Sequence, residues 1–239
     1  MSTPPSPPDD VPLFPSERPA PPPSAALLEA VAPAKRVRTR APRLALTVVA
    51  LAGAAWPLYA VAVKPWRSDL DALPWTWFLP VALLWLGGFV VPLTLALLPP
   101  KGQVLPDSGA AGRAALVAAA GLTVLGLFTV DAPGRTRLPA DTWADFAHWW
   151  WHCISFSLKV VIPSLVVGIA VLARVMLVGA ARLGAAVGAA GGALAGLTLH
   201  GLCPYGGVLH VALAHGGGVV LGAALGAVTF PLVRRLLDR

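Results

Sequence analysis

The sequence predicts an all-α polytopic membrane protein, a bundle of six transmembrane helices behind a proline-rich N-terminal tail. Of its 239 residues, 56% are apolar and only 12% are charged. A soluble domain of this size needs more charge to cover its surface. The apolar residues also form continuous blocks of about 20, the length that crosses the hydrocarbon core of a bilayer as a helix.

Six such blocks follow one another, and tryptophans mark several of their edges, as expected for side chains at a membrane interface. The tryptophans near block edges include Trp66, Trp75, Trp77 and Trp149 to Trp151. The predicted spans are Leu44–Val63, Trp75–Leu98, Ala110–Val130, Ile154–Ala173, Leu183–Leu202 and Val208–Leu232.

The basic residues predict the orientation of these spans. Cytoplasmic loops of membrane proteins carry an excess of Lys and Arg. With the N-terminus inside, the outer side holds only Lys64, Arg67, Arg135 and Arg137. The cytoplasmic side then holds Lys35, Arg36, Arg38, Arg40, Arg43, Lys101, Arg113, Arg174, Arg182, Arg234, Arg235 and Arg239. We therefore expect a multi-pass protein of the bacterial inner membrane with both termini in the cytoplasm.

The chain divides into three parts by composition. Residues 1–33 are rich in proline, which lacks an amide donor, so we expect a disordered cytoplasmic tail. Near residues 24–32 a short helical segment is predicted, in which Leu27, Leu28 and Val31 share one face. Residues 34–43 form a basic juxtamembrane segment, and residues 44–239 form the transmembrane domain.

Two rows of glycines predict close helix packing in the C-terminal part of the chain. Small residues four apart leave a flat groove on one helix face, so two backbones can approach closely. The fifth and sixth spans each carry such a row, and the loop between them is very short. The row glycines are Gly184, Gly188, Gly192 and Gly196 in the fifth span and Gly218, Gly222 and Gly226 in the sixth. General Gly and Ala enrichment is the alternative explanation.

The reactive side chains lie in the C-terminal half and, on this topology, toward the outer side. They are the two cysteines, Cys153 and Cys203, and the five histidines, His148, His152, His200, His210 and His215. Three interpretations stay open. Cys153 and Cys203 could form a disulfide or redox-responsive pair, His and Cys could bind a soft metal such as copper or zinc, or these side chains could make polar contacts without chemistry. The candidates for redox or metal sensing are Cys153, Cys203, His152, His200 and His215.

Other kinds of chemistry find little support in the sequence. No phosphate loop, catalytic triad or paired-carboxylate site is recognisable, so we expect no enzyme. No acidic residue lies deep in a span, which counts against ion-coupled transport. Lys159 lies inside the fourth span, close enough to its outer end for the ammonium to reach the interface.

With these features in place, residues 25–239 resemble the six-span bacterial inner-membrane anti-sigma factors typified by the negative regulator of sigma F. The tail helix with its basic run is similar to that family's N-terminal segment. Cys153 with Pro163 and Arg174 is similar to its fourth helix, and Gly188 to Gly196 to its fifth. The stretch from Leu199 to Pro204 resembles the family's His-Cys-Pro sequence, although two residues separate His200 from Cys203. Gly222 to Leu237 resembles its glycine-rich last helix.

The resemblance implies that the protein holds an extracytoplasmic-function sigma factor at the membrane and releases it on an envelope, metal or redox signal. Sigma-binding candidates are Leu27, Leu28, Val31, Arg36 and Arg38. The basic residues would also contact anionic lipid of the bilayer. No cofactor is required, with copper or zinc as conceivable signals, and no direct contact with nucleic acid is expected. The alternative is a small membrane protein of transport or envelope maintenance without a sigma partner.

Overall fold

The computed structural model describes residues 42–67, 70–101, 103, 105–128, 143–172, 179–203, 208–237 and 239. Within this part of the chain every regular element is helical, which confirms the predicted all-α fold. The tail, the short helix near residues 24–32 and most of the basic juxtamembrane segment lie outside the described residues. The elements are α2 (Pro42–Val63), η1 (Leu70–Ala72), α3 (Trp75–Leu97), α4 (Ser108–Phe128), α5 (Trp143–Leu172), α6 (Ala180–Leu202), α7 (Val208–His210), η2 (Val211–Gly216) and α8 (Gly217–Leu237).

Six helical stretches are long and apolar enough to cross a membrane, as the sequence predicted. Four predicted spans agree with α2, α3, α4 and α6 to within three residues at each end. Two differ more. Helix α5 begins at Trp143, well before the predicted Ile154, because helix continues through the polar and aromatic residues ahead of the apolar block. The last span is composite, since a π-helical turn, η2, joins α7 to α8.

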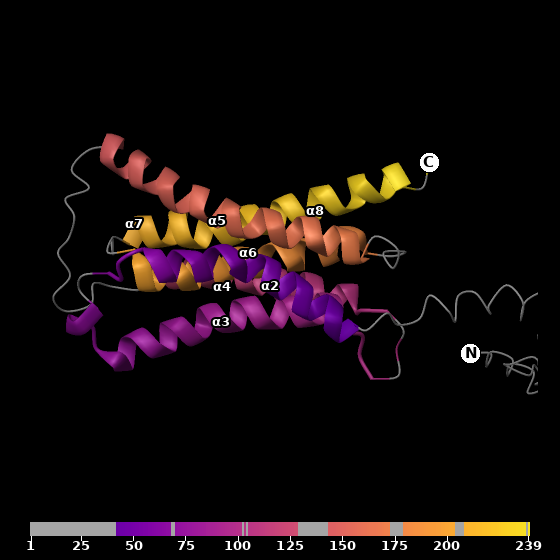
Figure 1. Cartoon of the computed structure of the whole chain (residues 1–239), viewed down its shortest axis with the longest axis horizontal. Helices are drawn as coiled ribbons and strands as arrows, with labels where there is room; N and C mark the ends of the chain where they lie inside the picture. The colour runs from indigo at the N-terminus through magenta and orange to yellow at the C-terminus, as the bar shows by residue number, and fades with distance from the viewer. Residues whose placement is uncertain are drawn as a thin grey trace, which may run out of the picture. The chain divides into compact units, whose positions relative to one another are not determined.

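Successive spans run in opposite directions, so the bundle has two chemically different ends (Figure 1). One end, called here the Cys/His end, carries the C-termini of α2, α4 and α6, the N-termini of α3 and α5, and the short helix α7. The other, called the basic end, carries the N-termini of α2, α4 and α6 and the C-termini of α3, α5 and α8. Lys64 and Arg67 are the described Lys and Arg residues of the loops at the Cys/His end. Those toward the basic end are Arg43, Lys101, Arg113, Arg182, Arg234, Arg235 and Arg239.

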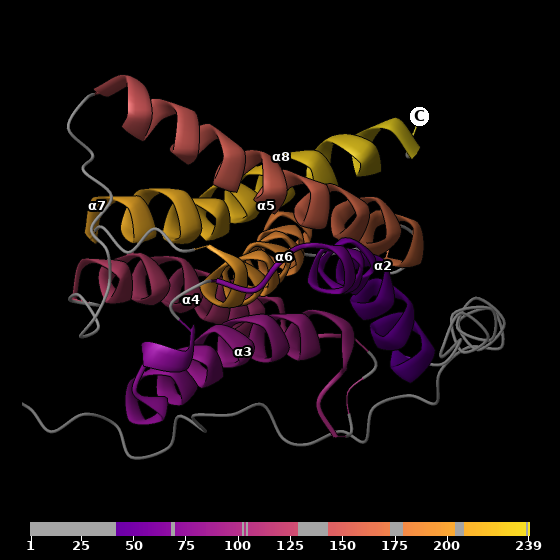
Figure 2. The same ribbon diagram turned by 60° about the vertical axis from the view of Figure 1, so that its left-hand side comes forward.

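Helix α6 lies at the centre of the bundle, with the other spans around it (Figure 2). Of its membrane-spanning window, 83% is buried inside the protein, whereas the other five spans bury 22–44% of theirs. Composition explains the position, because α6 consists mainly of Gly and Ala, which allow several helices to pack against it closely. Leucines and valines of the outer helices instead face outward, where lipid would solvate them; examples are Leu58, Leu83, Leu116 and Val166.

The two predicted glycine rows face each other across the contact between α6 and α8. Gly184 lies against Gly226 and Gly188 against Gly222, so closely that a Cβ on either partner would collide with the carbonyl group of the other. Further along, a Cβ on Gly192 would lie 2.5 Å from the Gly218 carbonyl oxygen. The last glycine of the row, Gly196, instead accommodates the indole ring of Trp85 from α3. Glycine is therefore required along this interface by the approach of two backbones.

Lys159, the cation inside α5, lies over an aromatic ring of α2. Its Nζ is 4.6 Å from the centre of the Trp56 ring. The face of an indole attracts a cation, and this attraction strengthens where water is scarce. The contact gives Lys159 a partner at the α2–α5 interface.

Substitution of a row glycine tests the packing. Gly188→Ala would place a methyl group against the backbone of Gly222, which cannot move without separating α6 from α8. We expect a loss of about 1–3 kcal/mol of stability, typical of overpacking. Thermal unfolding in detergent measures this loss of stability. The readout is the reaction of a fluorescent maleimide with the Cys153 and Cys203 thiols, which are buried until the protein unfolds.

Gly121→Ala is the matched control, because nothing lies within 4 Å of a Cβ added at Gly121 in α4. Alanine is the better helix former, so this variant should match or slightly exceed the parent in stability. Equal melting temperatures for the two variants would contradict the packing account.

Candidate metal centre

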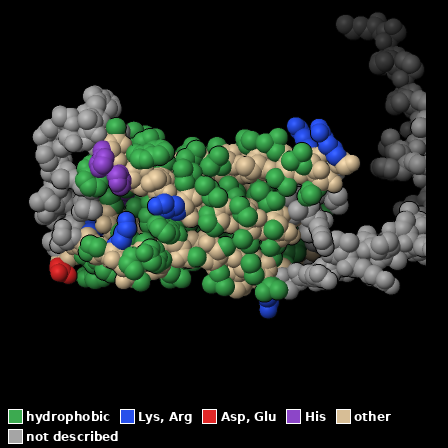
Figure 3. Space-filling view, turned by 45° about the horizontal axis from the view of Figure 1, so that its top comes forward, with side chains coloured by type: hydrophobic (Ala, Val, Ile, Leu, Met, Phe, Trp, Pro, Cys, Tyr) green, Lys and Arg blue, Asp and Glu red, His purple; other side chains and the backbone are tan. Residues whose placement is uncertain are grey.

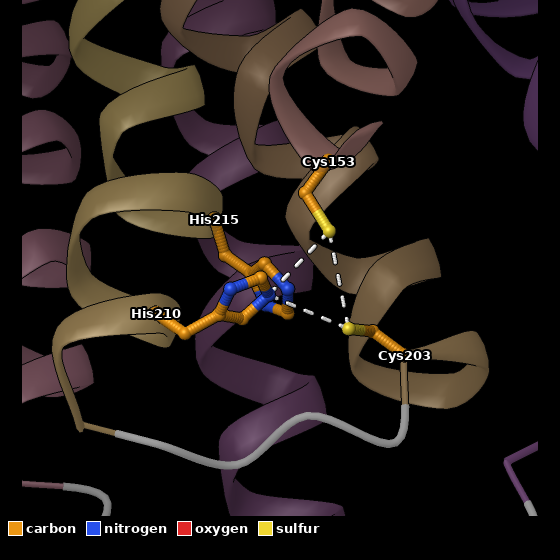
Figure 4. A group of neighbouring side chains, drawn as sticks. All are labelled: Cys153, Cys203, His210 and His215. Carbon is orange, nitrogen blue, oxygen red and sulfur yellow. Dashed lines mark hydrogen bonds between the residues drawn. The ribbon is translucent and has the colours of Figure 1, made fainter. Parts of the chain in front are cut away.

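Two cysteines and two histidines converge in a buried cluster at the Cys/His end (Figure 4). They are Cys153 on α5, Cys203 at the C-terminal end of α6, His210 on α7 and His215 on η2. All four side chains are buried, and their potential ligand atoms all lie within 4.8 Å of one another. Residues up to 62 positions apart in the chain thus meet at a single point, which we call the Cys2His2 cluster.

The distances within the cluster match those of a tetrahedral metal site. The two Sγ atoms are 3.9 Å apart, and the Nε2 of His210 is 3.5 Å from each of them. Zinc–sulfur and zinc–nitrogen bonds of about 2.3 and 2.0–2.1 Å in a tetrahedron imply S···S and S···N separations of about 3.8 and 3.5 Å. Three of the four donors therefore already define one face of a coordination tetrahedron, and His215 is within reach of the fourth position.

Two helices, α5 and α6, place the cysteines. Cys153 is a regular residue of α5 and turns inward toward α6. Cys203 caps α6, and its backbone N–H donates to the Leu199 carbonyl at 2.7 Å before the chain leaves the helix. The shared environment is apolar, with Phe156, Leu199 and Ala214 in the same hydrophobic cluster. A metal site in such surroundings would be closed, with all its ligands supplied by the protein and none by water. Thiolate and imidazole donors of this kind suit soft or borderline metals.

A π-helical turn places the histidines. His210 and His215 are five residues apart, and at about 3.6 residues per turn an α-helix would point them in different directions. The intervening segment Val211–Gly216 is π-helical, with a wider turn that brings residues five apart onto one side. Their rings meet edge to face, with centroids 5.3 Å apart. Single π-turns of this kind occur frequently at functional sites.

Neighbouring helices hold η2 in this conformation. The indole Nε1 of Trp150 on α5 donates to the Leu213 carbonyl at 3.1 Å. On the other side η2 packs directly on α4, where a Cβ added to Gly126 would lie 2.6 Å from the Cα of Ala212. A Cβ on Gly216 would similarly meet the Cα of Thr123. The π-turn is thus fixed between two helices that themselves contribute glycine or a hydrogen bond to it.

Arg67 secures the end of α6 that carries Cys203. Its guanidinium is buried and donates from Nη1 to the His200 carbonyl at 3.1 Å, and its backbone N–H donates to the Gly201 carbonyl at 3.2 Å. The last carbonyls of a helix lack partners within the helix and carry partial negative charge, so a cation is favourable there. Arg67 also lines a small cavity together with Cys203 and His215.

The remaining sensing candidates lie apart from the cluster. His152 is exposed on α5, directly before buried Cys153. His200 is buried beside α3, where its ring stacks on Phe78 at 4.5 Å and its Nε2 lies 3.2 Å from the Phe78 carbonyl oxygen. The sigma-binding candidates Leu27, Leu28, Val31, Arg36 and Arg38 lie outside the described residues. Both cysteines are free thiols in this structure.

His210 was the member of the cluster that sequence reasoning did not select. The signal that would have singled it out is a five-residue histidine spacing followed by three glycines, Gly216 to Gly218, which weaken a regular helix. A π-turn cannot be inferred from that pattern alone. Comparisons with protein-family models, curated proteins and solved structures found no match to the chain.

Proposed function

We propose that the protein is a membrane-bound regulator in which the Cys2His2 cluster binds a soft metal ion such as copper(I) or zinc, and that the regulated partner is an extracytoplasmic-function sigma factor. The observation that carries the metal proposal is the convergence of Cys153, Cys203, His210 and His215 with tetrahedral spacing. The sigma partner is supported by the resemblance of residues 25–239 to the anti-sigma factors described above.

A metal site explains the cluster better than two thiols that merely make separate apolar contacts. Buried polar side chains without function are costly in an apolar environment and are rare inside membrane bundles. Here four side chains that can ligate a metal, from three membrane spans, share one point. Thiolate and imidazole together suit copper(I) and zinc. A redox-responsive thiol pair remains the second candidate, because the two sulfur atoms are 3.9 Å apart, within reach of a bond after a modest movement.

The distribution of charge supports an orientation with the cluster on the outer side. The described Lys and Arg residues of the loops and helix ends gather toward the basic end, and the excess of Lys and Arg marks the cytoplasmic side. Both termini would then be cytoplasmic in a bacterial inner membrane. A signal from outside would reach Cys153 and Cys203, while the sigma factor would bind at the opposite face.

The helices that supply the ligands also connect the two faces. An ion bound by the cluster would join the N-terminal part of α5 to the end of α6 and the start of the last span. These helices continue across the bundle to the basic end. Coupling between two sites requires two states that each site prefers differently. Ligation and release at the cluster supply such states through the position of α5 against the α6–α8 pair.

Metal binding is tested on the full chain in lipid nanodiscs. We expect one equivalent of Cu(I) or Zn(II) to remain bound after equilibration with a chelator of intermediate strength. Cys153→Ser, Cys203→Ser, His210→Ala and His215→Ala should each weaken binding at least about tenfold, because even the partners of metal ligands contribute 10–100-fold. Competition titrations with a chromophoric chelator measure the affinities.

The double variant His148→Ala/His152→Ala is the matched control, since it removes two histidines without touching the cluster. It should retain the tightly bound ion. Full-strength binding after loss of both cysteines would refute a metal role for the cluster. A parent protein that takes up no metal but forms a Cys153–Cys203 disulfide on oxidation would favour the redox alternative.

Reporter fusions test the orientation. Fusions placed after Lys101 and after Arg137 should lie on opposite sides of the membrane, the first cytoplasmic, because the positive-inside bias places Lys101 inside. Alkaline phosphatase activity reports the outer side and green fluorescence the inner side. Both fusions on one side would be incompatible with six spans.

The tail is tested with the triple variant Leu27→Ala/Leu28→Ala/Val31→Ala. If these side chains are apolar anchors, each contributing about 1.5–3 kcal/mol, the variant should lose co-purification with the sigma factor and express its regulon constitutively. Deletion of residues 1–23, which removes proline-rich chain but no apolar face, should leave repression intact. Unchanged repression by the triple variant would place sigma binding elsewhere.

A further inference from the structure

Two histidines outside the cluster form a pair on the exposed surface of α5. His148 and His152 are four residues apart, so they stand one turn above the other on the same face of the helix. Both are exposed, and their ring centroids are 4.4 Å apart. Histidine side chains are visible on the surface at this end of the bundle (Figure 3), and His148 and His152 are the exposed histidines among the described residues.

The hydrogen bonding of His152 suits a metal ligand. Its Nδ1 lies 3.0 Å from the carbonyl oxygen of His148, and a carbonyl oxygen can only accept, so Nδ1 carries the proton. In the neutral ring, the form that binds metals, the lone pair is then on Nε2. Metal-binding histidines commonly donate their other ring N–H to a carbonyl in this way, which fixes both the tautomer and the orientation of the ring.

A neighbouring aromatic side chain restricts the pair further. The ring of Trp149 lies 5.2 Å from the His148 ring and 5.7 Å from the His152 ring, measured between centroids. Two imidazoles that already share one face of a helix lose little freedom when an ion bridges them, and this pre-organisation favours binding.

The chemistry of the pair defines the kind of ion. It offers two imidazole nitrogens and no thiolate, and its exposure leaves the remaining coordination positions open. Imidazole donors suit Zn, Cu and Ni, whereas Mg and Ca prefer oxygen. With a common set of donors, affinity rises from Ni(II) to Cu(II) and falls again at Zn(II).

We propose that His148 and His152 form a second metal site, an exposed two-imidazole site for divalent transition-metal ions at the N-terminal end of α5. It is separate from the Cys2His2 cluster, although His152 immediately precedes Cys153. An ion bridging residues one turn apart also stabilises the helix between them. The first turns of α5, from Trp143 onward, become more rigid when the site is filled.

The test uses the full chain with Cys153→Ser and Cys203→Ser, purified through a tag that contains no histidine and reconstituted in nanodiscs. We expect one equivalent of Cu(II) to bind in a calorimetric titration, with an electron paramagnetic resonance spectrum showing two coupled nitrogens. Ni(II) and Zn(II) should bind more weakly. Either His148→Ala or His152→Ala should weaken Cu(II) binding at least about tenfold.

A matched control keeps the number of histidines and changes only their spacing. Ala147→His/His148→Ala places the two histidines five apart in a regular helix, where they no longer share a face. It should bind as weakly as His148→Ala. Unaltered Cu(II) binding in this control, or in a variant without both histidines, would overturn the proposal and indicate adventitious binding elsewhere.

A second measurement covers the case in which the cysteine variants fail to fold. In the parent chain, His148→Ala/His152→Ala should lower the number of Cu(II) or Ni(II) equivalents by one and leave the tightly held ion in place. The two sites are removed by different substitutions, so the two proposals can fail independently. If the surface site binds no metal, the proposed metal binding by the Cys2His2 cluster is unaffected. If the double variant binds as many metal equivalents as the parent, the surface site is rejected.

Discussion

The close approach of α6 and α8 is the contact on which the rest of the structure depends. A helix that is mostly Gly and Ala buries little apolar area per residue, and inside a bilayer there is no water to drive its burial. Packing between Gly184, Gly188 and Gly192 of α6 and the Gly218–Gly226 row of α8 compensates, because backbones in direct contact gain van der Waals attraction over the length of that contact. Four other spans can then surround α6 at short range.

The position of the Cys2His2 cluster follows from that contact. Cys203 ends α6, and the π-turn with His215 leads directly into α8. The two helices are held side by side from Gly218 to Gly226, so their adjoining ends are also held together, and Arg67 fixes the carbonyls just before Cys203. Cys153 is different, since α5 brings it to the cluster from outside this pair. The cluster therefore has three potential ligands on the α6–α8 pair and a fourth on a neighbouring helix.

Hydrophobicity and glycine spacing were sufficient to predict the six spans and the faces on which α6 and α8 meet, because both signals repeat along many residues. The extension of α5 to Trp143 was missed because its first turns carry no apolar block. The cluster was predicted only in part. Cys153, Cys203 and His215 were selected by type, but His210 joins them through a π-turn. His200 is diverted to Phe78 by a contact with α3 that no local pattern reveals.

Helices α6 and α8 are packed tightly together, whereas α5 lies outside this pair. This difference gives the proposed regulation a physical basis. A ligand can shift an equilibrium only by its difference in affinity for two states. An ion held by Cys203, His210 and His215 alone would not distinguish positions of α5, because these donors belong to the frame. Adding Cys153 makes the full coordination depend on where α5 lies. On the proposed function, the free energy of the fourth bond would be the quantity that links a metal ion bound on the outer side to the inner face.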